Sequence, residues 1–393
     1  MKILFFSYTF GPNIGGIESV SAILAEKFAE AGHEVELVTE TAEKENVQPA
    51  FAVATAGRRP TPNVQRPIYK ITRKPSTLRL IRLLHWCDLL FQNNISLRSL
   101  IPALLMQKRV IVVHQTWLRN VRRGIGWNNR VKRSLLRFVT NVAISEAIRD
   151  DITLLASPSE GEADGAAGCS RVPVGRAHVS HSETATGLPA RGSQMPVIGN
   201  PYDDRVFRLR PEVTRDKTLV FVGRLVSDKG IDLLLGALKL LCDQALSPDL
   251  TIIGVGPEEG TLRQLTHELG LDRQVTFGGE KSGEELAATL NRHQIMVVPS
   301  RWAEPFGIVA LEGIACGCVI VGSRDGGLRE AIGSCGLTFK NGDERELADC
   351  VKTLLLDPQR RAVFQKDASA HLIKFRADSV ARDYIELINA IAH

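Results

Sequence analysis

Short apolar runs alternate with amphipathic segments along most of this sequence, and that alternation limits the folds open to the chain. Residues 2–8 form an apolar run, a glycine-containing loop covers 11–16, helical periodicity covers about 17–31, and a second apolar run covers 33–39. Strand, loop, helix and strand in this order predict a right-handed βαβ unit of a doubly wound sheet. The pattern returns between residues 218 and 339. The sequence therefore predicts an α/β protein whose ligands bind at the carboxyl ends of parallel strands.

The chain is long enough for two domains. Its 393 residues exceed the size at which a single hydrophobic core stops growing. We expect an N-terminal Rossmann-like domain over 1–200, a C-terminal one over 201–376, and a last helix over 377–393 that packs back on the N-terminal domain. Residues 156–195 are rich in Gly, Ser and Pro and poor in large apolar residues. We interpret this stretch as a disordered insertion.

Three other segments of the first domain are assigned from local pattern. Prolines interrupt 41–76, which we expect to be irregular. Residues 77–91 predict one helix with a broad apolar face. That helix suits either the core of the sheet or a membrane surface, and we favour the core because a doubly wound sheet needs a helix there. Residues 196–202 predict a return to a strand.

Charge is unevenly distributed along the chain. Residues 1–199 carry 25 Lys and Arg against 16 Asp and Glu, whereas residues 200–393 carry 24 against 28. Between 58 and 137 there are 18 basic residues and one acid, Asp88. Such a region predicts an anionic partner. Interleaved tryptophans also suggest nucleic acid, but no nucleic-acid motif accompanies them. We therefore expect an anionic membrane surface or acceptor, and no nucleic acid.

The stretch 299–312 carries the strongest chemical pattern. It follows an apolar run and leads into helical periodicity, and Pro305 suits the first turn of that helix. Glu304 then precedes the helix, and Glu312 lies about two turns into it. The two carboxylates flank free backbone N–H groups at residues 306–308, where a helix start attracts phosphate. One carboxylate can accept sugar hydroxyls, so the stretch predicts a nucleotide-sugar site. The helix dipole alone also stabilises a glutamate near a helix start, so Glu304 could be there without binding a ligand.

Weaker signals lie at other predicted strand ends. Gly15 and Gly16 allow close approach of a ligand to the backbone, although a plain turn explains them equally well. His114 ends an apolar run at the ligand edge of the sheet, or merely caps a strand. Arg224 and Lys229 follow the strand that opens the second domain, where two cations can neutralise a diphosphate or be ordinary loop cations.

Cysteine spacing and the length of the apolar runs bear on the cellular location. Seven cysteines without paired metal spacing fit a reducing compartment, and we interpret Cys316 and Cys318 as packing residues. The first residues are too short an apolar run for a signal peptide, and no run is long enough to cross a bilayer. We expect a cytoplasmic protein without a metal site.

A family resemblance follows from these motifs. Glu304-Pro-Phe-Gly-Ile-Val-Ala-Leu-Glu312 matches an E-x7-E motif, and Gly223-Arg224-Leu225 and Lys229-Gly230 accompany it. The chain resembles the retaining GT-B glycosyltransferases of family 4, the "glycosyl transferases group 1" type. That resemblance implies two Rossmann-like domains facing across a cleft. Supporting matches stand at Gly15-Gly16, His114, Asn200-Pro201, Gly254-Val-Gly-Pro-Glu258 and Gly326-Gly327.

The resemblance assigns roles to the candidate residues. It implies that Arg224 and Lys229 hold the donor diphosphate, that Glu304 acts beside the donor sugar, and that Glu312 binds the ribose hydroxyls. Three residues between the two glutamates complete the implied donor site: Phe306, Gly307 and Ile308.

The N-terminal domain has implied roles as well. His114 would reach toward the transferred sugar as a second catalytic residue. Gly15 and Gly16 would lie near the phosphate and the acceptor.

The implied reaction is transfer of a sugar from a nucleoside-diphosphate sugar to a glycan or lipid-linked acceptor, with retention and without a bound metal or other cofactor. The setting would be glycan synthesis at the inner face of the cytoplasmic membrane, with 58–137 on the lipid. Two alternatives remain, namely a sugar phosphorylase or epimerase of the same fold, and a catalytically silent scaffold that docks on membrane or polymer.

Overall fold

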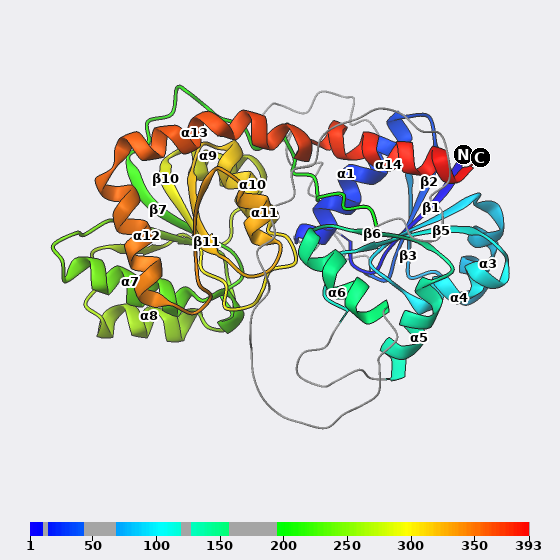
Figure 1. The fold of residues 1–393 in the computed structure, drawn as a ribbon, viewed down its shortest axis with the longest axis horizontal. Coiled ribbons are helices and arrows are strands. Elements are labelled where there is room, and N and C mark those ends of the chain that lie inside the picture. The colour runs from blue at the N-terminus through cyan, green and yellow to red at the C-terminus, as the bar shows by residue number, and fades with distance from the viewer. Residues whose placement is uncertain (11–14, 43–67, 119–126, 157–194, 393) are drawn as a thin grey trace.

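A computed structural model describes residues 1–10, 15–42, 68–118, 127–156 and 195–392. Within them the chain forms two α/β domains, each built on a parallel sheet of six strands flanked by helices (Figure 1). The predicted fold class, two doubly wound Rossmann-like domains, is confirmed. Most strand residues are buried, as expected for parallel strands covered on both faces.

The N-terminal sheet has the strand order β3-β2-β1-β4-β5-β6. Its strands are β1 (Lys2–Ser7), β2 (Glu34–Thr39), β3 (Lys70–Arg73), β4 (Leu89–Asn93), β5 (Arg109–His114) and β6 (Thr140–Ala143). Its helices are α1 (Gly16–Glu30), α3 (Thr77–Trp86), α4 (Leu97–Leu105), α5 (Trp127–Leu136) and α6 (Glu146–Ala156). Consecutive strands in space run parallel, so the side chains that follow them gather at one edge.

The C-terminal sheet has the equivalent order, β12-β11-β10-β7-β8-β9. Its strands are β7 (Lys217–Val222), β8 (Leu250–Ile253), β9 (Val275–Phe277), β10 (His293–Val298), β11 (Val319–Ser323) and β12 (Gly336–Phe339). Its helices are η1 (Ser227–Lys229, a 3-10 turn), α7 (Ile231–Cys242), α8 (Glu259–Glu268), α9 (Gly283–Asn291), α10 (Ile308–Ala315), α11 (Leu328–Ile332), α12 (Glu344–Leu356) and α13 (Pro358–Leu372). β7 and β10 are neighbours, so the loops that follow them meet.

The end of the chain crosses from the C-terminal domain to the N-terminal one. After α13, the 3-10 turn η2 (Ile373–Phe375) leads into α14 (Ala377–Ala392), which lies along α1 (Figure 1). The ring of Tyr384 packs 5.3 Å from that of Phe91 and 6.4 Å from that of Phe28. Lys27 and Asp378 form an ion pair of 2.7 Å. The last helix is thus part of the N-terminal core.

The structure corrects three local predictions. Residues 77–91 are not one helix, because the backbone of Cys87 is extended and Leu89–Asn93 forms β4 beside β1. The stretch 41–76 was expected to be irregular, yet β3 lies within it. The strand predicted over 196–202 forms only two isolated bridges, one to β6 and one to Arg376. The insertion predicted over 156–195 falls almost entirely on residues 157–194, which lie outside the described residues.

Candidate functional site

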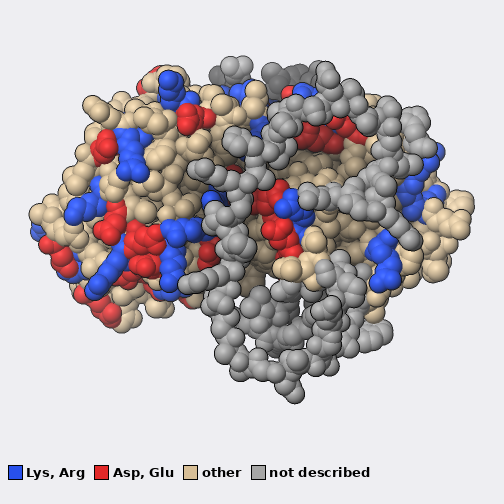
Figure 2. All heavy atoms as spheres, in the orientation of Figure 1, with Lys and Arg blue, Asp and Glu red and all other residues tan. Residues whose placement is uncertain are grey.

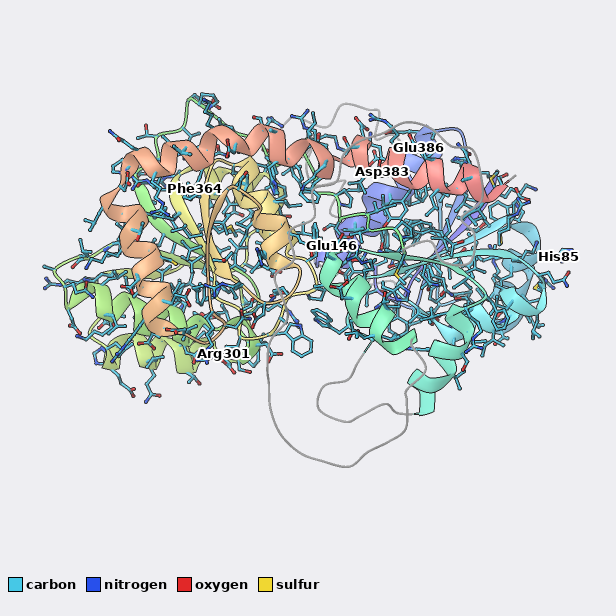
Figure 3. All side chains as sticks on the ribbon, viewed as in Figure 1. His85, Glu146, Arg301, Phe364, Asp383 and Glu386 are labelled. Carbon is cyan, nitrogen blue, oxygen red and sulfur yellow. The ribbon has the colours of Figure 1, made fainter. Side chains whose placement is uncertain are left out.

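Three of the four charged candidates of the C-terminal domain meet at one cavity. Arg224 follows β7, Lys229 ends η1, and Glu304 follows β10, so the pairing of the two strands brings all three together. The cavity has a volume of about 260 Å³ and is lined by Arg224, Val226, Asp228, Lys229, Trp302 and Glu304. Trp302 and Glu304 lie in the loop between β10 and α10, and Figure 3 labels Arg301 in the same loop. The site therefore combines two cations with two carboxylates, those of Asp228 and Glu304, at the ligand edge of the sheet.

An ion pair fixes the carboxylate of Glu304. Its Oε1 lies 2.6 Å from Lys229 Nζ and also accepts a hydrogen bond of 2.6 Å from Ser300 Oγ. The side chain of Glu304 is 14% exposed and that of Lys229 28%, so the pair is only partly screened by water. Oε2 has no hydrogen-bond partner among the residues that the structure describes. One oxygen of Glu304 is thus held, and the other is available to a ligand.

The start of α10 lies directly after this carboxylate. Gly307 is its N-cap with φ 108, a left-handed conformation that favours glycine, and no side chain caps the helix. The N–H of Ala310 bonds the carbonyl of Gly307 at 3.0 Å, whereas those of residues 307–309 have no partner among the described residues. Phe306 is buried against Phe375, with the two rings 5.5 Å apart and edge to face. The backbone before α10 is thereby anchored while its N–H groups stay open.

Gly16 places the N-terminal domain opposite α10. A Cβ on Gly16 would lie 3.1 Å from Cδ1 of Ile308, so the first residues of α1 and α10 touch across the two domains. The carboxylate of Glu18 lies over Gly15, where a Cβ would come within 2.4 Å of its Oε2. The two helix starts thus form opposite walls of one interdomain site. Residues 11–14 of the predicted glycine loop lie outside the described residues.

His114 is buried at the end of β5 and does not line the cavity. The amide nitrogen of Asn141 donates to two backbone carbonyls, so its Oδ1 faces Nε2 of His114 at 3.0 Å. Nε2 therefore carries a proton, and Nδ1 is a buried acceptor without a partner among the described residues. Burial lowers the pKa of His114. The imidazole is neutral at pH 7.

Glu312 lies in the second turn of α10 and is not among the cavity's lining residues. Burial first, and then the nearby carboxylate of Asp203, raise the pKa of Glu312 to about 8. At neutral pH the group is thus largely protonated and can donate as well as accept a hydrogen bond. Its role toward a ribose stays a prediction.

Comparisons with known proteins agree with this geometry. The family model "Glycosyl transferases group 1" matches residues 204–371, and the model "Glycosyltransferase Family 4" matches residues 14–159. Together they cover well over half of the chain. The chain belongs to the GT-B glycosyltransferases of the family 4 type. The resemblance drawn from the E-x7-E motif is confirmed.

Relatives within this glycosyltransferase family match part of the chain. The D-inositol 3-phosphate glycosyltransferase of Corynebacterium jeikeium is 36% identical over 186 residues, which are 44% of this chain and 44% of the relative. The glycogen synthase of Mycobacterium tuberculosis is 36% identical over 177 residues, 43% of this chain and 42% of the relative. The chain thus matches less than half the length of these curated relatives.

Solved structures match the whole fold. Anabaena HepE in complex with UDP and glucose has a TM-score of 0.73 at 18% identity, covering 99% of this chain and 100% of that one. Sucrose-phosphate synthase of Thermosynechococcus elongatus has a TM-score of 0.72 at 18% identity, covering 100% of this chain and 99% of that one. These matches show the two-domain fold.

Two residues beside the glutamate of this glycosyltransferase were missed by sequence reasoning. Trp302 is 40% exposed and lines the cavity, and Ser300 holds Glu304. Both stand within four residues of Glu304, so their place in the loop was the available signal. Within the described ranges, no group of three or more His, Cys, Asp or Glu side chains is placed to hold a metal ion. None of the described helices is both long and apolar enough to span a bilayer.

Proposed function

We propose that this protein is a retaining glycosyltransferase that moves a sugar from a nucleoside-diphosphate sugar to a hydroxyl of a glycan or lipid-linked acceptor. The observation that carries the proposal is the Lys229–Glu304 pair, which stands beside Arg224 in a cavity next to an uncapped helix start. Family membership supports the reaction class. The solved relatives in complex with UDP and with UDP-glucose support a nucleotide-sugar donor.

The cations fit the leaving group of this reaction. The bond from the anomeric carbon to the diphosphate breaks, and negative charge grows on the departing phosphate oxygen. Arg224 is exposed at the cavity and Lys229 is only partly screened, so both can stabilise that charge together with the first N–H groups of α10. Lys229 would then divide its hydrogen bonds between Glu304 and the diphosphate. No metal is required in this proposal.

The carboxylates fit the neutral parts of the donor. The open Oε2 of Glu304 can accept a sugar hydroxyl, which orients the anomeric carbon toward the N-terminal domain. We assign Glu312 to the ribose hydroxyls. Retention follows if the acceptor attacks the face from which the diphosphate leaves and passes its proton to a departing phosphate oxygen. His114 is neutral, and its buried Nδ1 has no hydrogen-bond partner among the described residues. It would lie on the side of the site where the acceptor binds.

The N-terminal domain also offers a surface for a lipid-linked acceptor. α3 and α4 pack together and expose Leu78 (71%), Ile81 (41%) and Leu105 (81%). Their exposed basic neighbours are Arg79, Arg82, Arg98 and Arg109. By contrast, acidic and basic side chains intermix over the C-terminal domain (Figure 2). Apolar side chains among cations suit an anionic membrane, and we propose that this face lies on it.

Turnover of a donor panel tests the reaction. UDP-, GDP- and ADP-sugars are incubated with the wild type, Lys229→Ala and Glu312→Ala, and the released nucleoside diphosphate is quantified. One donor should be turned over, with a loss of about a hundredfold in either variant (~2.7 kcal/mol). Lys281→Ala, which breaks the i,i+4 ion pair between Lys281, just before α9, and Glu285 within it, is the matched control and should keep full activity. A sugar phosphate formed only with orthophosphate would indicate a phosphorylase, and no turnover or donor binding would favour a scaffold.

Vesicle flotation tests the membrane surface. Leu78→Asp/Leu105→Asp should lose binding to phosphatidylglycerol vesicles, because it places charge on the apolar stripe. Leu356→Asp changes a leucine of similar exposure (61%) on α12 and should still float. Equal binding by all three proteins would contradict the assignment. Flotation lost with Lys229→Ala would instead indicate that the donor cavity is the anion site.

A further inference from the structure

Three consecutive backbone carbonyls around Glu304 are all held by hydrogen bonds, two of them from the other domain. Trp117 Nε1 donates to the carbonyl of Ala303 at 2.8 Å, and Ser145 Oγ donates to that of Pro305 at 2.8 Å. The carbonyl of Glu304 itself accepts from the N–H of Gly327 at 2.7 Å. The position of the loop therefore depends on the N-terminal domain.

Ser145 also forms a hydrogen bond within its own, N-terminal domain. Its side chain is fully buried between β6 and α6, and its Oγ accepts the N–H of Ile148 at 3.2 Å as the cap of α6. The hydroxyl proton is thus free for Pro305 while a lone pair serves the helix. One side chain couples the start of α6 to the backbone beside the donor cavity.

The start of α6 receives a second contact from the C-terminal domain. The carboxylate of Glu330 in α11 accepts the N–H of Glu146 at 2.9 Å and that of Ala147 at 3.3 Å. Figure 3 places Glu146 at the end of α6 that faces the C-terminal domain. A carboxylate at a helix start is favoured by the helix dipole. The N-terminus of α6 is therefore capped across the domain boundary.

The junction is too tight for any side chain at Gly327. A Cβ there would lie 2.1 Å from the carbonyl oxygen of Pro305 and 2.7 Å from Ser145 Oγ. Gly326 has φ +86, and its Cβ would lie 2.4 Å from the carbonyl oxygen of Glu304. The backbones of the two loops consequently meet directly, and a small shift of one moves the other.

We infer that Trp117, Ser145 and Glu330 are positioning residues that hold the Glu304 loop in its reactive place only while the two domains are in contact. The inference rests on the proposed function. The donor diphosphate is bound by Arg224 and Lys229, which belong to the C-terminal domain alone. Loss of the interdomain contacts should therefore leave nucleotide binding intact and lower the rate of the chemical step.

The experiment compares kcat for transfer with the Kd of the nucleoside diphosphate that the donor panel identifies. Trp117→Phe keeps an aromatic ring but is smaller and lacks the N–H, Ser145→Ala removes the hydroxyl, and Glu330→Gln keeps the shape without the charge. We expect kcat to fall about ten- to a hundredfold in each, with Kd within about twofold of the wild type because no cavity residue changes. Ser145→Thr keeps a hydroxyl and should restore most of the rate. Trp86→Phe, on α3 away from the junction, should match the wild type.

Two outcomes overturn the inference. In the first, the wild type is active and the folded variants keep its kcat. In the second, Kd and turnover worsen in proportion, which would place these residues in donor binding or general stability. A wild type inactive with every donor sinks the proposed function, and this inference with it. Glu330→Gln is the mildest of the three changes, and it decides between these outcomes if Ser145→Ala does not fold.

Discussion

The two domains share one sheet order but present different side chains at the ends of their strands. In the C-terminal domain the residues after β7 and β10 are charged and reachable, namely Arg224 and Glu304. In the N-terminal domain the side chains at the ends of the central strands β4 and β5 are neutral and buried. Asn93 ends β4 and Gln115 follows β5, and Gln115 Nε2 donates to Asn93 Oδ1 at 2.8 Å. The same edge of the same fold carries charges in one domain and an amide network in the other.

The amide network has a structural consequence. Gln115 exchanges two hydrogen bonds with Asn200, at 2.8 and 2.9 Å, on the segment that leads to the C-terminal domain. It thus joins the N-terminal sheet to the interdomain connection. The charged groups lie where we propose that the donor diphosphate binds, whereas the neutral buried groups join the N-terminal sheet to the interdomain connection. We expect substitutions in the first set to change activity and those in the second to change stability.

The largest expected effect is on activity, from Arg224→Gln. Arg224 is exposed at the cavity, and it forms no ion pair with any of the described residues, so its removal should leave the fold intact. We expect kcat/KM to fall about a hundredfold (~2.7 kcal/mol) with an unchanged unfolding temperature. Arg263→Gln, which breaks a pair on α8, is the control. A parallel drop in unfolding temperature would show that Arg224 is structural.

Glu312 is the exception in this comparison, because it is a half-buried acid in the charged domain and does not line the cavity. Its pKa of about 8 exceeds that of an unfolded glutamate, so the unfolded chain releases the proton first as the pH rises. Stability due to this group is fully present below about pH 4.5 and is lost between there and about pH 8. Glu312→Gln should therefore be similar to the wild type at pH 4.5 and more stable than it by on the order of 2 kcal/mol at pH 6.

Thermal unfolding across that pH range measures the difference. A constant gap between Glu312→Gln and the wild type would contradict the protonated state of Glu312.

The amide network supplies the next effect. Gln115→Leu leaves the side chains of Asn93 and Asn200 buried without these partners, which should lower the free energy of unfolding by about 1.5 kcal/mol. Denaturant titration measures it. Gln264→Leu, which removes an exposed amide that bonds Glu268, should cost far less. If both variants lose the same stability, the network has no special role.

The smallest expected effect is a gain in stability. The hydroxyl of Tyr384 is buried without a hydrogen-bond partner among the described residues, and burial raises its pKa. Tyr384→Phe keeps the ring contacts with Phe28 and Phe91 and removes an unpaired polar group. We expect a gain of about 0.5–1 kcal/mol in the free energy of unfolding. A loss would indicate a partner for the hydroxyl.

The fold and the charged residues of the cavity could be predicted from the sequence because both have local signals. The period of apolar residues predicted most strands, and Arg224, Lys229 and Glu304 each follow one. It failed at β4, since Leu89–Asn93 continues the apolar face of the preceding helix without a break in composition. It assigned β3 to an irregular stretch because prolines dominate the residues before it.

The interdomain contacts had no such signal. Ser145 and Pro305 are 160 residues apart, and Trp117 and Ala303 are 186 apart. A serine after a strand and a glutamate in a short helix are ordinary in any α/β protein. Only the packing of one domain on the other brings them together, so their role becomes visible in the structure alone.

Calorimetric titration of UDP, GDP and ADP tests the central claim most directly, because it separates the two domains without requiring an acceptor. The account predicts that one nucleoside diphosphate binds the wild type saturably, that Lys229→Ala abolishes this binding, and that His114→Gln in the N-terminal domain retains it. Lys281→Ala should bind like the wild type. Saturable binding that survives Lys229→Ala, or that is lost equally with His114→Gln, would contradict a donor site built by the C-terminal domain.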